Sequence, residues 1–173
     1  MIAVRTWMLA LAVACLGLFS VPGFAQDAQT GGGPVLEITT RHGVITIETF
    51  PDDAPATVAR MTELAESGFF NGLTFHRVVP GFVVQGGDPE GNGRGGSGQT
   101  IKAEFNDHKH VLGTVAMARA QDPDSADSQF YISLGTHPHL DGKYTIFGQV
   151  TDGIDAVLQV VQGDVMESVM VTR

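Results

Sequence analysis

The chain has very little cysteine and tryptophan: among its 173 residues there is one of each. Both lie early in the sequence, as Trp7 and Cys15. If this N-terminal part is removed, the remaining protein has no cysteine, so it can form no disulfide. It also has no thiolate for nucleophilic attack or for metal binding.

Basic residues are scarce as well. The chain contains 10 lysines and arginines against 19 aspartates and glutamates, for a net charge of −9. Nucleic-acid binding is excluded as the expected function, because contacts with phosphate require a basic face. The acidic balance favours solubility.

The first 25 residues have the pattern of a secretory signal peptide. Arg5 is their only charge, residues 8–21 are almost wholly apolar, and Gly23-Phe24-Ala25 offers small residues for cleavage. A membrane anchor is the alternative, but the apolar run is shorter than the roughly 20 residues that span a bilayer. We therefore predict cleavage after Ala25 and a periplasmic or secreted protein that has no membrane contact afterwards.

Cys15 lies within the apolar run, where a lipoprotein would carry its lipid. The preceding Ala12-Val13-Ala14 is a poor lipoprotein signal, because a large aliphatic residue is expected at the position of Ala12. Residues 26–34 are polar and glycine-rich, and we predict a flexible linker there. The folded domain is expected over residues 35–173.

Short strand patterns dominate this domain. Apolar residues favour strands near 35–38, 44–50, 74–78, 82–85, 114–117, 130–134, 146–150 and 168–172. Helices are predicted over 53–67 and over 153–161, where Ile154, Val157, Leu158 and Val161 follow helical spacing. The pattern predicts a mostly β fold with two helices and no repeating βαβ unit.

Four separated motifs identify a family. They are FHRVVPGFVVQGGD at 75–88, AMARA at 116–120, SQFYIS at 128–133 and HLDGKYTIFG at 139–148. Together, in this order, they resemble the active-site face of a cyclophilin. The resemblance implies a closed eight-stranded antiparallel β-barrel capped by two α-helices. It also implies a monomeric peptidyl-prolyl cis/trans isomerase that needs no cofactor and acts on proline-containing peptides and on unfolded or partly folded proteins. With the signal peptide, this predicts an enzyme that assists the folding of exported proteins.

The chemistry needs few groups. Amide resonance gives the X–Pro bond a rotational barrier of about 18–20 kcal/mol. Twisting the bond localises a lone pair on the prolyl nitrogen, so a donor aimed at that nitrogen stabilises the twisted state more than the planar ones. Arg77 is the predicted catalytic donor, because arginine is always charged and presents several N–H groups in a fixed fork.

The resemblance also assigns the substrate-binding residues. Phe82, Val83, Tyr131 and Leu140 would form an apolar socket for the proline ring. Gln85 would contact the substrate carbonyl, and Gln129 would lie near the peptide backbone. The remaining predicted positions line the groove and its rim: Ala118, Arg119, Ala120, His139 and Tyr144.

Four positions depart from the best-known cyclophilins. Val83 replaces a methionine, Tyr131 a phenylalanine, His139 a tryptophan and Tyr144 a histidine. None of these changes removes the arginine, so isomerase activity stays the prediction. The missing tryptophan predicts weak cyclosporin binding, because the indole N–H and its apolar area are lost.

Two other functions compete with this interpretation. A peptide-binding module without catalysis would keep the groove. A metal-dependent hydrolase could use two H-x-H pairs, His108 with His110 and His137 with His139, as zinc ligands. Because no acidic motif completes a hydrolase site and Pro138 splits the second pair, we predict no metal.

Two loops carry weaker signals. Residues 86–98 are glycine-rich but lack the lysine of a phosphate-binding loop, so a flexible surface loop is predicted. Residues 121–129 contain Asp122, Asp124 and Asp127 close to the proposed groove. These aspartates predict a modest preference for lysine or arginine beside the substrate proline.

Overall fold

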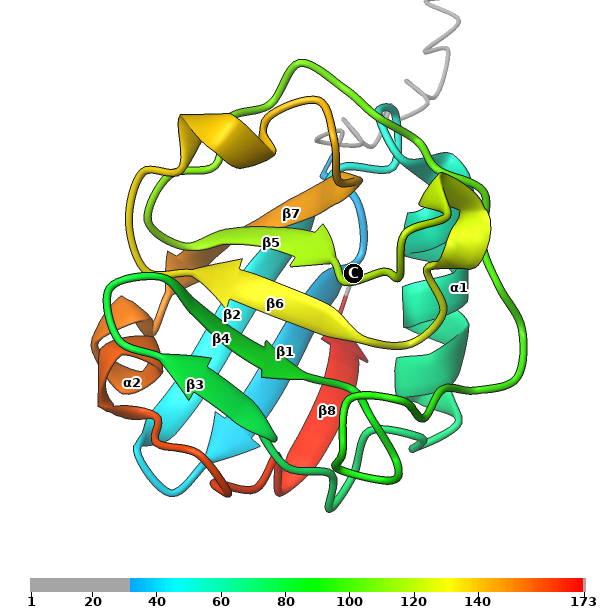
Figure 1. Cartoon of the computed structure of the whole chain (residues 1–173). Coiled ribbons are helices and arrows are strands. Elements are labelled where there is room, and N and C mark those ends of the chain that lie inside the picture. Colours follow the sequence, from blue (N-terminus) through cyan, green and yellow to red (C-terminus); the bar gives the residue numbers. More distant parts are fainter. Residues whose placement is uncertain (1–31, 173) are drawn as a thin grey trace, which may run out of the picture.

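The computed structural model describes residues 32–172, which contain one eight-stranded sheet and two α-helices (Figure 1). The predicted signal peptide and residues 26–31 of the predicted linker lie outside the described residues. The strands are β1 (Val35–Thr40), β2 (Gly43–Thr49), β3 (Arg77–Val79), β4 (Val83–Gly86), β5 (Thr114–Met117), β6 (Phe130–Ser133), β7 (Ile146–Asp152) and β8 (Ser168–Thr172). The helices are α1 (Pro55–Glu66) and α2 (Ile154–Gln159), and two 3₁₀ turns cover Pro123–Ser125 and Pro138–Leu140.

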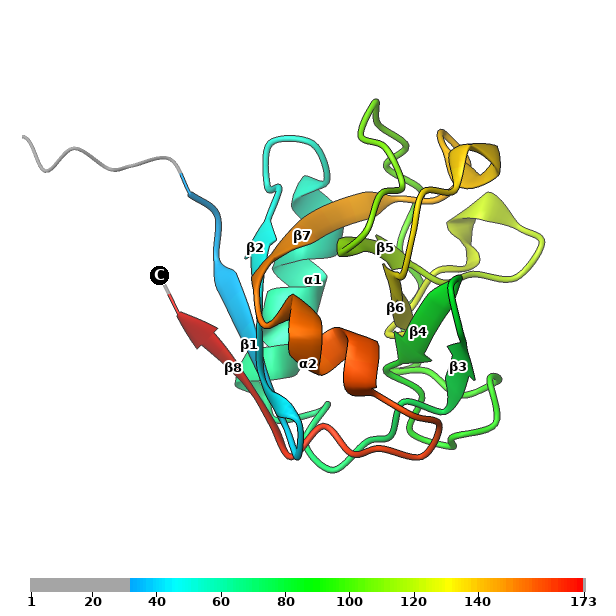
Figure 2. The same ribbon diagram turned by 90° about the vertical axis from the view of Figure 1, so that its left-hand side faces the viewer.

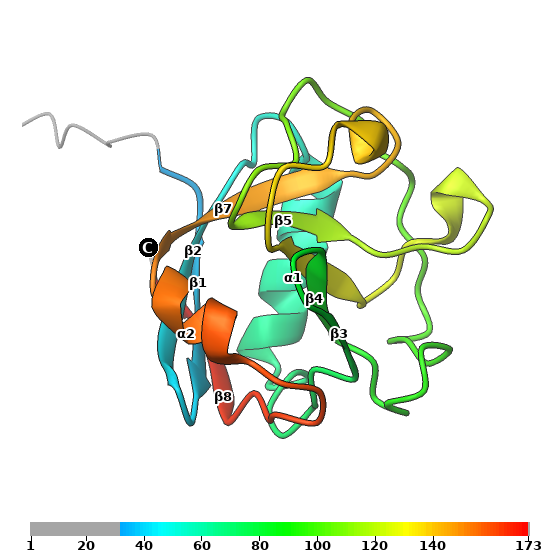
Figure 3. The same cartoon turned by 60° about the vertical axis from the view of Figure 1, so that its left-hand side comes forward.

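The sheet runs in the order β3-β4-β6-β5-β7-β2-β1-β8, and every neighbouring pair is antiparallel. It curves round the core, with β1, β2 and β8 on one side and β3 and β4 on the other (Figure 3). The two helices lie on opposite sides of the molecule, with α2 in front and α1 behind in Figure 2. The predicted mostly β fold with eight antiparallel strands and two helices is therefore confirmed.

The prediction of a closed barrel is wrong. β3 and β8 are the two edges of the sheet and do not pair with each other. The gap is crossed by the segments that precede them: the Phe75 N–H donates to the Asp164 carbonyl at 2.8 Å, and the Met166 N–H to the Leu73 carbonyl at 2.8 Å. Because this pairing ends before either strand begins, and β3 has only three residues, the sheet stays an open half-barrel.

The hairpin of β1 and β2 shows how alternation builds the core. Leu36 pairs with Ile47 and Ile38 with Ile45, and all four side chains are buried. The residues between them point to the other face, as the pleat of a strand requires. At the turn Gly43 has a φ of 129°, a conformation that side chains other than glycine rarely adopt.

Helix α1 obtains its N-terminal cap from a distant residue. Pro55 occupies the first turn, where a missing N–H does no harm. The residue before it is Ala54, whose side chain cannot accept a hydrogen bond. Instead the carboxylate of Glu104 accepts the N–H groups of Ala56 at 2.9 Å and Thr57 at 2.8 Å. The segment around Glu104 is thereby tied to the helix.

Helix α2 is shorter than predicted, and two of the four residues that were expected to form its buried apolar face are exposed. The helix stops at Gln159, and Val160 turns inward in extended conformation. Val157 is buried, but Leu158 is 54% exposed and Val161 51% exposed. With only six residues the helix presents one turn to the sheet, so the second turn of the predicted face does not form.

The sheet is buried on both faces where the site lies. Phe130 and Ile132 of β6 face the main core, whereas Tyr131 between them faces a second, smaller cluster with Val83, Ala116 and Ile146. Partly buried side chains pack on this second cluster, and they are Phe50, Phe82, Ala118, Leu140 and Tyr144. The strands β4, β5 and β6 thus form the floor of a surface pocket.

Candidate active site

A pocket of about 200 Å³ opens over β4, β5 and β6. Nine of the twelve predicted site residues line it, and within residues 32–172 no other residue does: Arg77, Phe82, Val83, Gln85, Ala118, Arg119, Tyr131, Leu140 and Tyr144. Val83 and Tyr131 are buried, and the others are partly buried or exposed at the rim. The structure therefore brings together residues from four separate motifs, while their individual roles stay predictions.

Arg77 begins a chain of side-chain hydrogen bonds along the pocket wall. Its Nη1 donates to Oε1 of Gln85 at 3.2 Å, and Nε2 of Gln85 donates to Oε1 of Gln129 at 2.9 Å. The chain ends where Nε2 of Gln129 donates to the carbonyl of Gly95 at 2.8 Å. Both amides are oriented by these partners, and Arg77 retains further N–H groups for a ligand.

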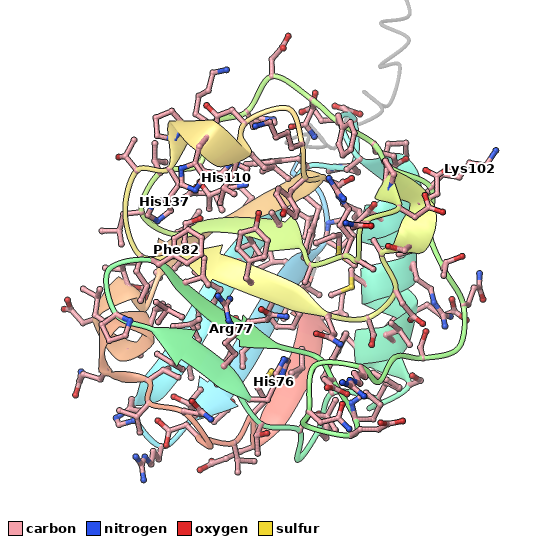
Figure 4. The ribbon with its side chains drawn as sticks, viewed as in Figure 1. His76, Arg77, Phe82, Lys102, His110 and His137 are labelled. Carbon is pink, nitrogen blue, oxygen red and sulfur yellow. The ribbon has the colours of Figure 1, made fainter. Side chains whose placement is uncertain are left out.

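Phe82 forms the neighbouring wall. The Arg77 Cζ lies 5.9 Å from the centre of the Phe82 ring, and both side chains share one face of the molecule (Figure 4). His139 does not line the pocket, but its ring stacks on Phe82 with centroids 6.0 Å apart. His137 fixes the main chain here, because its Nε2 lies 2.9 Å from the Phe82 carbonyl.

The guanidinium of Arg119 is anchored in the opposite wall. It donates to the carbonyls of Lys143, Ala120 and Gln121, and its Cζ lies 4.8 Å from the centre of the Tyr144 ring. The side chain therefore braces the rim. The hydrogen bond that the resemblance predicts from the Arg119 main chain to an extended ligand stays a prediction.

The floor of the pocket is the ring of Tyr131. It meets Tyr144 edge-on with centroids 5.8 Å apart, and only 5% of the residue is exposed. Burial raises the pKa of the Tyr131 hydroxyl, so the hydroxyl stays protonated. The hydroxyl oxygen lies 2.9 Å from Nε2 of His110, a residue that sequence reasoning had considered only as a metal ligand.

A larger groove of about 440 Å³ continues from the pocket and shares Gln85, Ala118 and Arg119 with it. The predicted residues Ala120 and Gln129 line this groove rather than the pocket. Asp127, predicted beside the groove, lines it as well, and the other lining residues were not predicted: Gly93, Arg94, Gly95, Gly96, Thr100 and Ser125. A peptide in the pocket therefore has an adjoining surface for a neighbouring residue.

The wall of this groove is the glycine-rich segment, and two carboxylates hold it in place. Asp88 is buried and accepts the N–H groups of Glu90, Asn92 and Gly93. Asp127 accepts the N–H groups of Ser97 and Gly98. Burial alone would raise the pKa of the Asp88 carboxyl, but the three N–H donors outweigh it and lower the pKa below its usual value. The segment is a surface loop, as predicted, and it is tied to the domain at both carboxylates.

The histidine pairs do not converge on a common point. Nε2 of His108 contacts Asp53 at 2.8 Å, whereas His110 contacts Tyr131 and Asp141. Within residues 32–172 no group of three or more His, Cys, Asp or Glu side chains is arranged to hold a metal ion. The same part of the chain contains no helix long and apolar enough to cross a membrane.

Comparison with known proteins gives one consistent answer. Residues 35–173 match the family model described as "Cyclophilin type peptidyl-prolyl cis-trans isomerase/CLD". The chain is 50% identical over 129 residues to peptidyl-prolyl cis-trans isomerase B of Bacillus subtilis, which covers 73% of this chain and 90% of the relative. It is 46% identical over 137 residues to a peptidyl-prolyl cis-trans isomerase of Helicobacter pylori, which covers 77% of this chain and 83% of the relative.

A solved structure is similar over nearly its whole length. The crystal structure of a Cryptosporidium parvum cyclophilin-type peptidyl-prolyl cis-trans isomerase, determined in the presence of the dipeptide Ala-Pro, superposes with a TM-score of 0.75. The sequences are 28% identical, and the match covers 80% of this chain and 99% of the other.

Proposed function

The chain belongs to the cyclophilin-type peptidyl-prolyl cis/trans isomerases, and on this premise we propose that it isomerises X–Pro bonds in exported proteins with Arg77 as the catalytic donor. One observation carries the proposal for Arg77. Its guanidinium stands at the edge of an apolar socket of about 200 Å³ and is oriented there by Gln85 at 3.2 Å.

The proposed mechanism is electrostatic. The proline ring enters the socket between Phe82 and Tyr131, where its apolar surface leaves water. As the amide twists, the prolyl nitrogen gains a lone pair, and a free N–H of Arg77 donates to it. This bond is stronger in the twisted state than in either planar state, so it lowers the barrier without a covalent step.

The flanking peptide would lie across the larger groove. Gln85 and Gln129 face that groove with amides that donate and accept, and the small side chains of Ala118 and Ala120 let a main chain approach closely. The Cryptosporidium protein was solved in the presence of Ala-Pro, and we propose the same class of ligand, a proline-containing peptide, for this chain.

The direct test follows cis/trans exchange of a short Ala-Pro peptide by NMR. Uncatalysed exchange takes roughly 10–100 s at 25 °C, so catalysis at micromolar protein is easily seen as exchange broadening. We expect acceleration by the wild-type protein. A peptide that binds without faster exchange would support the alternative of a binding module without catalysis.

The export part of the proposal depends on the sequence of the first 25 residues, in which Arg5 is the only charge. Expression of the full chain in a Gram-negative host, followed by cell fractionation and intact-mass analysis, tests it. We expect the protein outside the cytoplasm with Gln26 as its first residue. A full-length cytoplasmic protein would contradict export and leave the isomerase activity unaffected.

A further inference from the structure

A buried histidine supports the floor of the proline socket from behind. His110 has no exposed surface, and its two ring nitrogens have different partners. Nε2 lies 2.9 Å from the Tyr131 hydroxyl, and Nδ1 lies 3.0 Å from Oδ1 of Asp141. The imidazole also stacks on the Tyr131 ring, with centroids 6.0 Å apart and planes 15° from parallel.

The direction of these hydrogen bonds follows from their chemistry. Asp141 also accepts the main-chain N–H of His110 at 2.9 Å, and these bonds lower the pKa of its carboxyl, so it is ionised at neutral pH. An ionised carboxylate only accepts, so Nδ1 of His110 carries the proton. The Nε2 of the neutral ring must then accept, and the Tyr131 hydroxyl must donate to it.

Several other groups surround the imidazole. Tyr144 meets its ring edge-on, with centroids 6.4 Å apart. His137 and His139 each disfavour its protonation, and Lys109 lies 3.8 Å from Asp141 on the exposed side. Burial is the largest influence and lowers the pKa of His110, whereas Asp141 raises it by a smaller amount.

We propose that His110 and Asp141 are positioning residues of the isomerase, which hold the Tyr131 ring as the floor of the proline socket only while His110 is neutral. When His110 is protonated, Nε2 becomes a donor, so the tyrosine hydroxyl must accept and turn its own proton away. Within residues 32–172 the hydroxyl has no other hydrogen-bond partner, so its proton would be left unpaired in a buried site. The ring must shift to relieve this, and the socket changes shape.

The inference rests on the proposed isomerase activity, and a double-mutant cycle tests it. We compare wild type, Tyr131→Phe, His110→Gln and the double variant, using a capped Ala-Pro peptide without titratable groups from pH 5 to pH 8. Each single substitution should lower kcat/KM at pH 7.5 by roughly threefold to tenfold, the effect of one hydrogen bond. The double variant should lose no more than either single one.

The pH profile separates positioning from general loss of structure. Wild-type kcat/KM should fall at acid pH with a midpoint below the ordinary histidine value of about 6.5. This acid limb should disappear in Tyr131→Phe and in His110→Gln. Additive losses in the cycle, or an acid limb that persists in Tyr131→Phe, would overturn the proposal.

Two further measurements keep the test decisive. The ¹⁵N shifts of the wild-type ring should show His110 protonated on Nδ1, and a proton on Nε2 would contradict the arrangement. If His110→Gln does not fold, Asp141→Ala removes the acceptor at the partly exposed end of the same hydrogen-bond chain and should behave like Tyr131→Phe. If wild type binds the peptide but does not isomerise it, the proposed function fails. In that case the Kd of the peptide, measured for the same four proteins, still tests whether His110 positions Tyr131.

Discussion

Arg77 and Gln85 are directly opposite each other on β3 and β4, and their side chains meet at 3.2 Å between Nη1 and Oε1. The register of two short strands therefore sets the position of the guanidinium. Gln85 is in turn the register partner of Tyr131 on β6, and Tyr131 is that of Ala116 on β5. Three motifs thus become one surface through these antiparallel pairings, and the fourth joins them because Ala116 is also the register partner of Ile146 on β7.

The first prediction concerns Arg77. Arg77→Ala should lower kcat/KM by roughly two to three orders of magnitude, a loss of about 3–4 kcal/mol in transition-state stabilisation. Arg77→Lys should recover only a part, because lysine lacks the planar fork. The fold should persist, since the side chain is exposed. The measurement is the peptide exchange assay, with circular dichroism for the fold.

Lys102→Ala is the charge-matched control. This exposed lysine lies at the edge of the molecule, far from Arg77 (Figure 4). Its removal takes away the same charge and should leave kcat/KM unchanged. Near-wild-type turnover of Arg77→Ala would refute the mechanism, and an equal loss in both variants would show that net charge rather than the donor matters.

A second prediction follows from the cap that Glu104 provides to α1. Glu104→Ala should reduce the free energy of unfolding by about 0.5–2 kcal/mol, the usual contribution of an N-terminal cap. It should not change kcat/KM, because Glu104 does not line the pocket or the groove. Urea unfolding measures the effect, with the exposed Glu167→Ala as control. Equal stability of the two variants would contradict a capping role.

A third prediction concerns acid stability. Asp164 is buried and accepts hydrogen bonds from the Val161 N–H at 2.9 Å and from His42 at 2.8 Å, beside Arg41 at 2.7 Å. Burial would raise the pKa of its carboxyl, but these partners outweigh burial and lower it. A group with a lowered folded pKa stabilises fully above its unfolded value of about 3.9, and that stability is lost as the pH falls toward the folded pKa.

The variant Asp164→Asn tests this directly. Wild type should lose unfolding free energy as the pH falls below about 4, and the variant should lose less over the same range because it has one fewer carboxyl to protonate. The variant should also be less stable at pH 7. Parallel curves of unfolding free energy against pH for the two proteins would show that Asp164 does not contribute to acid sensitivity.

The strands and the pocket residues could be predicted from the sequence, but the open edge of the sheet and several buried polar interactions could not. The resemblance of the four motifs to a cyclophilin was sufficient to select the nine residues that line the pocket. The open edge between β3 and β8 could not be predicted, because strand closure depends on spacing in three dimensions. The buried Asp88 and the role of Tyr131 with His110 were also missed. Tyr131 and His110 are 21 residues apart, so nothing local indicates that they pair. Asp88 instead accepts main-chain N–H groups of Glu90, Asn92 and Gly93, and these bonds depend on the fold of the glycine-rich segment, which its composition does not reveal.

The last prediction concerns the charge of the substrate. The three aspartates predicted to favour basic peptides all accept N–H groups, Asp122 from Asp124, Asp124 from Ala103 and Asp127 from Ser97 and Gly98. They still carry negative charge, and Asp127 lines the larger groove, but Arg94 lines the same groove with the opposite sign.

We therefore expect only a small preference for lysine over glutamate beside the X–Pro pair, on the order of 1 kcal/mol or less, because exposed charges are screened within about 8–10 Å. Arg94→Ala should enlarge this preference, since it removes one of the two arginines that line the groove, Arg119 being the other, and leaves Asp127 in place. The measurement is kcat/KM for matched peptides with Lys, Ala or Glu at that position, at low and high salt, in wild type and Arg94→Ala. High salt should reduce the preference in both proteins. Equal values for the three peptides in Arg94→Ala at low salt, or a preference that salt does not weaken, would show that groove charge does not select the substrate.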